Sequence, residues 1–89
     1  MTPSYIRHSD LRLTAVDGEG VVLHLGSRQY FSVNATGVTI LEQLRAPSTL
    51  AEIVSAVTAE YDVGDDEATQ TVRAFLDRCL EASLVTEAH

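Results

Sequence analysis

The chain has 89 residues, a formal net charge of −7 and a pI of about 4.6. This length suffices for one domain with a modest core, and the 45% hydrophobic content is typical of a globular protein. The six basic residues are all arginines and are scattered along the chain, so there is no cluster of positive charge of the kind that binds duplex DNA. We therefore expect one domain over residues 1–89 that does not bind nucleic acid.

The sequence also bears on the protein's location. It contains no run of about 18 apolar residues, so no membrane-spanning helix is expected. The first ten residues, MTPSYIRHSD, lack the apolar stretch of a signal peptide. The single cysteine, Cys79, excludes an internal disulfide bond. These features predict a cytoplasmic protein with no membrane partner.

The first third of the chain has the pattern of a β-meander. Residues 11–16 (LRLTAV) alternate between apolar and polar side chains, as a half-buried strand does. An Asp-Gly turn follows, and then two further strand-like segments, 21–25 and 29–33, joined by a short Gly-containing link. The short links predict an antiparallel sheet in which the segment 29–33 forms an edge.

Three helices are predicted after the sheet. The first covers 35–46, with Asn34 as its N-cap, and the second covers about 49–60, with a capping box from Thr49 to Glu52. The third begins with Asp65 or Asp66 as its cap and ends near residue 82, and the Leu-Val pair at 84–85 closes the core. The order βββααα predicts an α+β fold that resembles a winged helix-turn-helix with its sheet first.

Candidate catalytic and metal-binding residues are few. His8 and His89 lie near the termini, and His24 lies within a predicted strand, where an exposed or hydrogen-bonded structural histidine is expected. Cys79 falls on the apolar stripe of the last helix and is expected to be a core residue. The loop 61–66 lacks the closing glutamate of a calcium loop. We therefore expect no enzyme activity, no metal site and no cofactor.

The predicted edge strand QYFSV (29–33) is the most informative feature. Natural proteins protect such edges with lysine, proline or a bulge, and this segment has none of them. One interpretation is that the chain's own tail covers the edge, or that the edge is too short to be harmful. The other is that it accepts an added strand from a partner peptide. Pairing of two such edges in a homodimer is a further possibility, although a monomer is expected.

Three segments in order resemble the proteins of the PqqD-like family. They are YFSVNATGVTILEQL (30–44), STLAEIVSAVTAEYDV (48–63) and TVRAFLDRCLEASLV (71–85). The resemblance covers residues 11–85 and implies a non-enzymatic recognition element for ribosomally made, post-translationally modified peptides. Within the family, SRQYFSVNATG resembles the bacterial lasso-peptide branch, although Ser27-Arg28-Gln29 replaces a direct Gly-Arg-Tyr and Val33 stands where leucine is commoner.

The resemblance implies how a partner would bind. The leader peptide of a precursor would lie as an extra strand against 29–33, in a groove walled by the third helix, and a separate cysteine protease would remove the leader. The strand would contribute Gln29, Tyr30, Phe31, Ser32 and Val33. The helix would contribute Val72, Phe75, Leu76 and Cys79, with Arg73 or Thr69 at the rim. Which faces of the strand and helix meet the leader stays open at this point.

Two other functions are considered. The first is a PqqD-type chaperone for a radical S-adenosylmethionine enzyme that modifies peptides, although the segment RAPST (45–49) lacks the Cys-Asp-Gly-like step of the pyrroloquinoline quinone branch. The second is a winged-helix DNA-binding regulator. Such a regulator needs a basic recognition helix, and the segment 49–60 contains no lysine or arginine and two glutamates.

Overall fold

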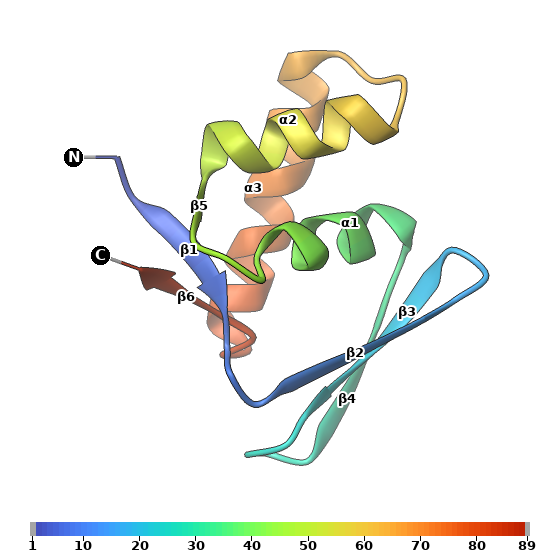
Figure 1. Ribbon diagram of the computed structural model, residues 1–89, viewed down its shortest axis with the longest axis vertical. Helices are drawn as coiled ribbons and strands as arrows, with labels where there is room; N and C mark the ends of the chain where they lie inside the picture. The colour runs from blue at the N-terminus through green and yellow to red at the C-terminus, as the bar shows by residue number, and fades with distance from the viewer. Residues whose placement is uncertain (1, 89) are drawn as a thin grey trace.

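The computed structural model describes residues 2–88 and contains two small antiparallel sheets and three helices (Figure 1). His89, one of the three histidines considered above, lies outside the described residues. The elements in chain order are β1 (Ser4–Arg7), β2 (Leu11–Val16), β3 (Glu19–His24), β4 (Gln29–Val33), α1 (Ala35–Gln43), β5 (Ser48–Thr49), α2 (Leu50–Glu60), α3 (Asp65–Glu81) and β6 (Val85–Ala88).

The predicted meander is confirmed as the sheet β2-β3-β4, in which β3 is central and β4 is an edge strand. Asp17 and Gly18 join β2 to β3 with φ angles of 51° and 80°. Two positive φ angles in a two-residue loop define a type I′ turn, whose twist matches that of the flanking strands. The Asp-Gly pair therefore sets the register in which Val16 lies opposite Glu19.

A second sheet, with strand order β5-β1-β6, was not predicted. It joins the two ends of the chain, since Ser4 lies opposite Ala88 and its hydroxyl donates to the Ala88 carbonyl over 2.9 Å. The prediction of only three strands is therefore incomplete. The physical reason is that strands of two to four residues carry little periodic pattern, and their partners lie far away in the sequence.

The helix starts were mostly predicted correctly. The Asn34 side-chain oxygen accepts from the Gly37 N–H over 2.9 Å at the start of α1, and Thr49 and Glu52 form the expected capping box of α2. The predicted cap of α3 is wrong, because Gly64 is its N-cap and makes no side-chain hydrogen bond. Asp65 and Asp66 lie instead in the first turn, where carboxylates favour the helix dipole.

The predicted helices were slightly longer than those in the structure. The first helix ends at Gln43 rather than at residue 46, because the chain then turns so that Ser48 and Thr49 can pair with β1. α2 begins at Leu50 and α3 ends at Glu81, each within one residue of its predicted bound.

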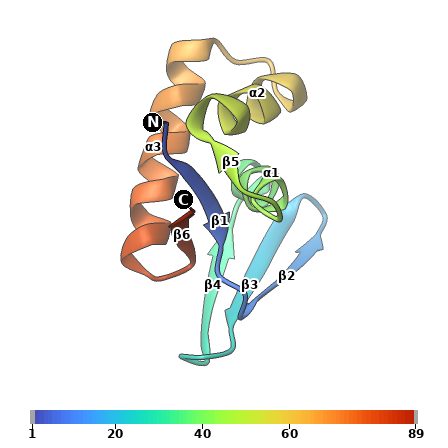
Figure 2. The same ribbon diagram turned by 60° about the vertical axis from the view of Figure 1, so that its left-hand side comes forward.

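The core lies between the helices and the inner face of the main sheet. α1 contacts both β3 and α2, while α2 packs on α3 (Figure 2). The completely buried large side chains come from all three helices and from both sheets; they are Ile40, Leu41, Leu44, Ile53, Val57, Val72, Val22 and Val85. Within residues 2–88, no helix is long and apolar enough to cross a membrane.

The end of α3 is held by a Schellman motif that also positions Leu84. The Leu84 N–H donates to the Cys79 carbonyl over 2.8 Å, and the Ser83 N–H donates to the Leu80 carbonyl over 3.2 Å. Between these bonds Ser83 adopts a φ of 61°, in the left-handed region.

The substitution Ser83→Gly should increase stability. A left-handed conformation costs a non-glycine residue about 1 kcal/mol, and part of the gain is offset by the greater freedom of glycine in the unfolded chain. We expect urea denaturation to show a free energy of unfolding about 0.5 kcal/mol higher for Ser83→Gly and clearly lower for Ser83→Val. A stabilising effect of valine would contradict this account of the turn.

Candidate functional site

β4 is an edge strand whose far side is unpaired within residues 2–88. The C-terminal strand β6 pairs with β1 and not with β4, so the idea that the tail covers this edge is wrong for the described part of the tail. Backbone N–H and C=O groups need hydrogen-bond partners, and an unpaired strand edge presents a row of them.

Two hydrogen bonds of the main sheet fix the direction of its backbone groups. The His24 carbonyl accepts from the Arg28 N–H over 2.7 Å and therefore points towards β4. The Leu25 N–H donates to the Asp10 carbonyl over 3.0 Å and therefore points towards β2. In an antiparallel sheet the N–H and C=O of one residue point to the same side, and successive residues alternate.

This alternation identifies the groups that face the free edge of β4. Val22 lies two residues before His24, so its backbone points to β4, where it pairs with Phe31. Phe31 therefore bonds to β3, and its neighbours Tyr30 and Ser32 direct their N–H and C=O groups away from the sheet. The free edge thus offers two donors and two acceptors with the spacing of one further strand.

An apolar groove of about 370 Å³ runs between β4 and the C-terminal half of α3. We call it the β4–α3 groove. Its strand side is formed by Phe31, Ser32, Val33 and Asn34. Its helix side is formed by Phe75, Arg78, Cys79, Ala82 and Leu84. The groove therefore lies directly beside the unpaired edge.

The structure separates the five predicted strand residues by face. Phe31 and Val33 point inward and pack against the core, next to the groove. Tyr30 and Ser32 are exposed and project from the opposite face; Ser32 also borders the groove at the strand edge, and Tyr30 is 72% exposed. Gln29 is exposed at the start of the strand and does not line the groove. Sequence alternation alone had left this choice of face open.

The predicted residues of α3 fall on different sides of the helix. Phe75 and Cys79 line the groove, whereas Val72 is completely buried and does not line it. Leu76 and Arg73 line a separate hollow on another side of α3. The structure therefore brings these two residues together with each other but not with the groove.

The predicted rim residue Thr69 lies nearer the start of α3. Its hydroxyl donates to the Asp65 carbonyl within the helix over 2.7 Å, and Thr69 does not line the groove.

Four residues that line the groove were not predicted: Asn34, Arg78, Ala82 and Leu84. Arg78 and Ala82 lie three and seven residues after Phe75, so helical spacing from Phe75 would have found them. Leu84 reaches the groove only because the Schellman turn reverses the chain, and no periodic pattern announces this turn.

Close packing of α1 fixes Phe75 in place. A Cβ atom on Gly37 would lie 2.9 Å from Phe75 Cε1 and 3.1 Å from Val33 Cβ. These distances leave no room for a larger residue unless the aromatic ring moves. Gly37 thus allows α1, β4 and α3 to meet at the floor of the groove.

The thiol of Cys79 is free and buried. Burial raises its pKa from the ordinary value of 9.0 to about 11, and the opposing effect of the Arg78 charge is smaller. Because the thiolate is the reactive form, we expect Ellman's reagent to react with the native protein at pH 8 far more slowly than with the protein in urea. Equal rates would contradict the burial of this thiol.

The same shift has a consequence for stability at high pH. Above pH 9 the unfolded chain releases the thiol proton, whereas the folded chain keeps it until about pH 11. The contribution of the buried thiol to stability is therefore present below pH 9 and is lost as the pH rises through this window.

His8 and His24 both accept hydrogen bonds from the backbone. His24 is buried, its Nδ1 accepts from the Ser27 N–H over 3.2 Å, and its ring lies 4.8 Å from that of His8. The Nδ1 of His8 accepts from the Asp10 N–H over 3.0 Å. In residues 2–88 no three His, Cys, Asp or Glu side chains gather into a group that could hold a metal ion.

Comparisons with known proteins agree with this geometry. The model of the family described as coenzyme PQQ synthesis protein D (PqqD) matches residues 19–85. The chain belongs to the PqqD family. This confirms the resemblance inferred from the sequence. A search of curated proteins gave no match.

Two solved structures have the same fold as this PqqD family member. One, described as TbiB1 in complex with the TbiA(beta) leader peptide, is 30% identical, with a TM-score of 0.79 over 90% of this chain and 93% of that one. The other is described as lasso peptide synthetase B1 complexed with the leader peptide. It is 21% identical, with a TM-score of 0.76 over 92% of this chain and 96% of that one.

Proposed function

We propose that this protein binds the leader peptide of a ribosomally made precursor of the lasso-peptide type, by adding the leader as a strand to β4. The observation that carries the proposal is the free edge of β4, where Tyr30 and Ser32 direct unpaired backbone groups outward beside an apolar groove. The two similar structures, both complexes with leader peptides, support the same ligand class.

The added strand explains both affinity and selectivity. The leader backbone would exchange hydrogen bonds with Tyr30 and Ser32, which gives affinity independent of leader sequence. Because side chains alternate along a strand, the leader residue between those two pairs faces the groove. There it would contact Phe31, Phe75 and Cys79, all apolar, so the groove selects an apolar leader side chain.

The domain performs no bond chemistry in this proposal. It holds the leader, leaves the downstream peptide free, and delivers it to a separate cysteine protease that removes the leader. Tethering raises the effective concentration of the substrate near the protease, so that a weakly recognised cleavage site is processed faster. This role needs neither a metal nor a cofactor.

The test is a titration of the purified protein with a fluorescent synthetic leader, taken from the precursor encoded beside this chain. We expect saturable binding at micromolar concentration or below, and none to a random DNA duplex. Sedimentation of the peptide-free protein should give a monomer. Failure to bind the leader at high concentration would overturn the proposal, and a dimer that dissociates on adding leader would assign the β4 edge to self-pairing in the free protein.

One alternative has a specific observation in its favour. The matching family is described as coenzyme PQQ synthesis protein D, which favours a chaperone role for a radical S-adenosylmethionine enzyme that modifies peptides. In that role the protein would bind a leader at the same β4 edge. The two roles differ in the enzyme that receives the peptide. Pull-down of the cysteine protease, and not of a radical enzyme, by the leader-loaded protein would favour the lasso-peptide pathway.

A further inference from the structure

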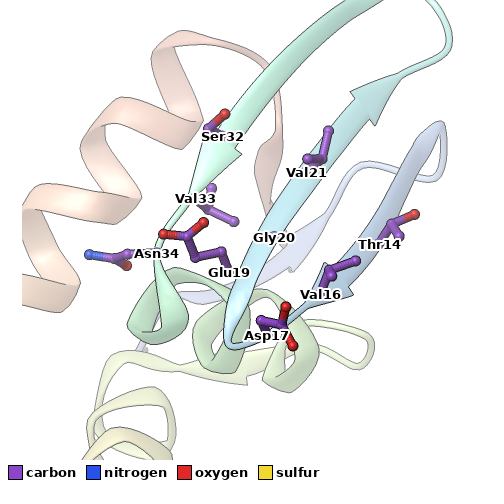
Figure 3. Close-up of a pocket in the computed structure, with 9 residues that line it drawn as sticks. All are labelled: Thr14, Val16, Asp17, Glu19, Gly20, Val21, Ser32, Val33 and Asn34. Carbon is purple, nitrogen blue, oxygen red and sulfur yellow. The ribbon is translucent and has the colours of Figure 1, made fainter.

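A second hollow, which we call the outer hollow, lies at the end of the main sheet, where the side chains of Thr14, Val16 and Val21 line it from the outer face. It shares Ser32, Val33 and Asn34 with the β4–α3 groove, so the two meet at the end of β4. The outer hollow has a volume of about 450 Å³ and lies near the Asp17–Gly18 turn (Figure 3). Its floor contains Val16 and Val21, which are 63% and 47% exposed. Val21 lies opposite Thr14 and Val16 opposite Glu19, so the two valines are diagonal neighbours on the outer face, within reach of one long aliphatic side chain.

The border of this outer hollow is acidic. Asp17 and Glu19 line it, and no arginine does. In Figure 3 the Glu19 carboxylate extends towards the end of β4, the side on which an added strand would lie. An apolar floor with carboxylates at its border suits a lysine or arginine side chain, whose aliphatic stem packs while its charged end stays near the carboxylates.

The register of the sheet connects the outer hollow to the proposed leader strand. Ser32 lies opposite Val21 on β3, so both side chains share the outer face. A leader residue paired with Ser32 would project onto this face as well. Because Ser32 is small, a long side chain from the leader can extend over it towards Val21, about 10 Å away across two strand spacings. Glu19 lies two residues further along β3, within reach of the charged end of such a side chain.

We propose that the outer hollow is a second leader subsite, which takes a lysine or arginine from the leader residue paired with Ser32. This inference rests on the proposed function, because it requires the leader to lie along β4. The leader then makes contacts on both faces of the sheet. One of its apolar side chains enters the β4–α3 groove, and one of its basic side chains lies over Val16 and Val21 with its charged end near Glu19. The net charge of −7 favours the same basic partner over longer distances.

The experiment is a scan of the synthetic leader in which each position carries lysine, glutamate or norleucine in turn. With the wild-type protein at low salt, one position should favour lysine over glutamate by about tenfold in Kd, and this preference should shrink at about 0.5 M salt. The preference should reverse at the same position with the Glu19→Lys protein. Glu19→Gln should reduce the preference without reversing it.

The matched control is Glu60→Lys, which changes the net charge equally but lies on α2, away from the sheet. Glu60→Lys should leave unchanged both the leader position that shows a preference and its preference for lysine over glutamate. If no leader position reverses its preference in Glu19→Lys while Ser32→Pro still weakens leader binding, the outer subsite is refuted and the proposed function stands. If wild-type protein binds no leader variant, both are refuted.

Discussion

Replacing Ser32 with proline should weaken leader binding by about tenfold while the domain stays folded. The Ser32 N–H points to the free edge, so its loss removes no bond of the β3–β4 ladder but leaves one leader carbonyl without a donor. An unsatisfied acceptor at an interface costs about 1–3 kcal/mol, and about 1.4 kcal/mol corresponds to a factor of ten. Proline is tolerated at an edge strand when its nitrogen faces outward. Titration with the fluorescent leader measures the change.

Two controls separate the lost donor from other effects. Ser32→Ala keeps the N–H and removes only the hydroxyl, so its affinity should be within about twofold of wild type. Ala15→Pro places proline at the opposite edge of the same sheet, where alternation also directs the N–H outward, and should not affect the leader. Unchanged affinity in Ser32→Pro, or an equal loss in Ala15→Pro, would exclude strand addition to β4.

Filling the groove should have the second large effect. Ala82 lines the β4–α3 groove at the end of α3, so Ala82→Trp should occupy the space for the inward leader side chain. Excluding a buried side chain the size of leucine or phenylalanine removes about 1.5–3 kcal/mol of burial, which predicts a rise in Kd of at least tenfold. Because the groove is open to solvent, the indole should not disturb the core beneath it. The leader titration again gives the result.

The control for Ala82→Trp is Ala59→Trp, since Ala59 is exposed on α2 and lines no part of the groove. Circular dichroism and thermal unfolding should show that both proteins fold. Equal leader affinity for the two tryptophan variants would mean that the leader contacts only the β4 edge, and that the groove contributes nothing to selectivity.

The sequence predicted those parts of the fold whose signals are local. The Asp-Gly pair at 17–18 predicted a tight turn with positive φ angles, Asn34 predicted the N-cap of α1, and the Thr49–Glu52 spacing predicted a capping box; the structure has all three. Each of these depends on a few neighbouring residues and on the chemistry of one turn. Together with the alternating and helical apolar patterns, these signals predicted the main sheet and the three helices.

What the sequence did not predict depends on distant contacts. The β1–β6 pairing joins Ser4 to Ala88, and no pattern in four residues identifies a partner so far along the chain. The cap of α3 was misplaced because aspartate is favoured both as an N-cap and in the first turn of a helix. In the structure Gly64 is the N-cap, and Asp65 and Asp66 occupy the first turn.

The candidate site shows the same division. The edge character of β4 was readable from its position after two short turns, because the residues of a meander pair in order. The side of α3 that faces β4 could not be predicted in this way, because Phe75 and Leu76 are adjacent in the sequence and both apolar. In the structure Phe75 packs closely against Gly37 and lines the groove, while Leu76 lines the other hollow with Tyr5.

The most direct test of strand addition is amide hydrogen exchange, measured residue by residue by NMR with and without the leader. The account predicts that the amides of Tyr30 and Ser32 exchange quickly in the free protein and become protected in the complex. The amides of Leu13 and Ala15, at the opposite edge, should be unaffected. A leader that binds tightly while the amides of Tyr30 and Ser32 stay unprotected would contradict the central claim.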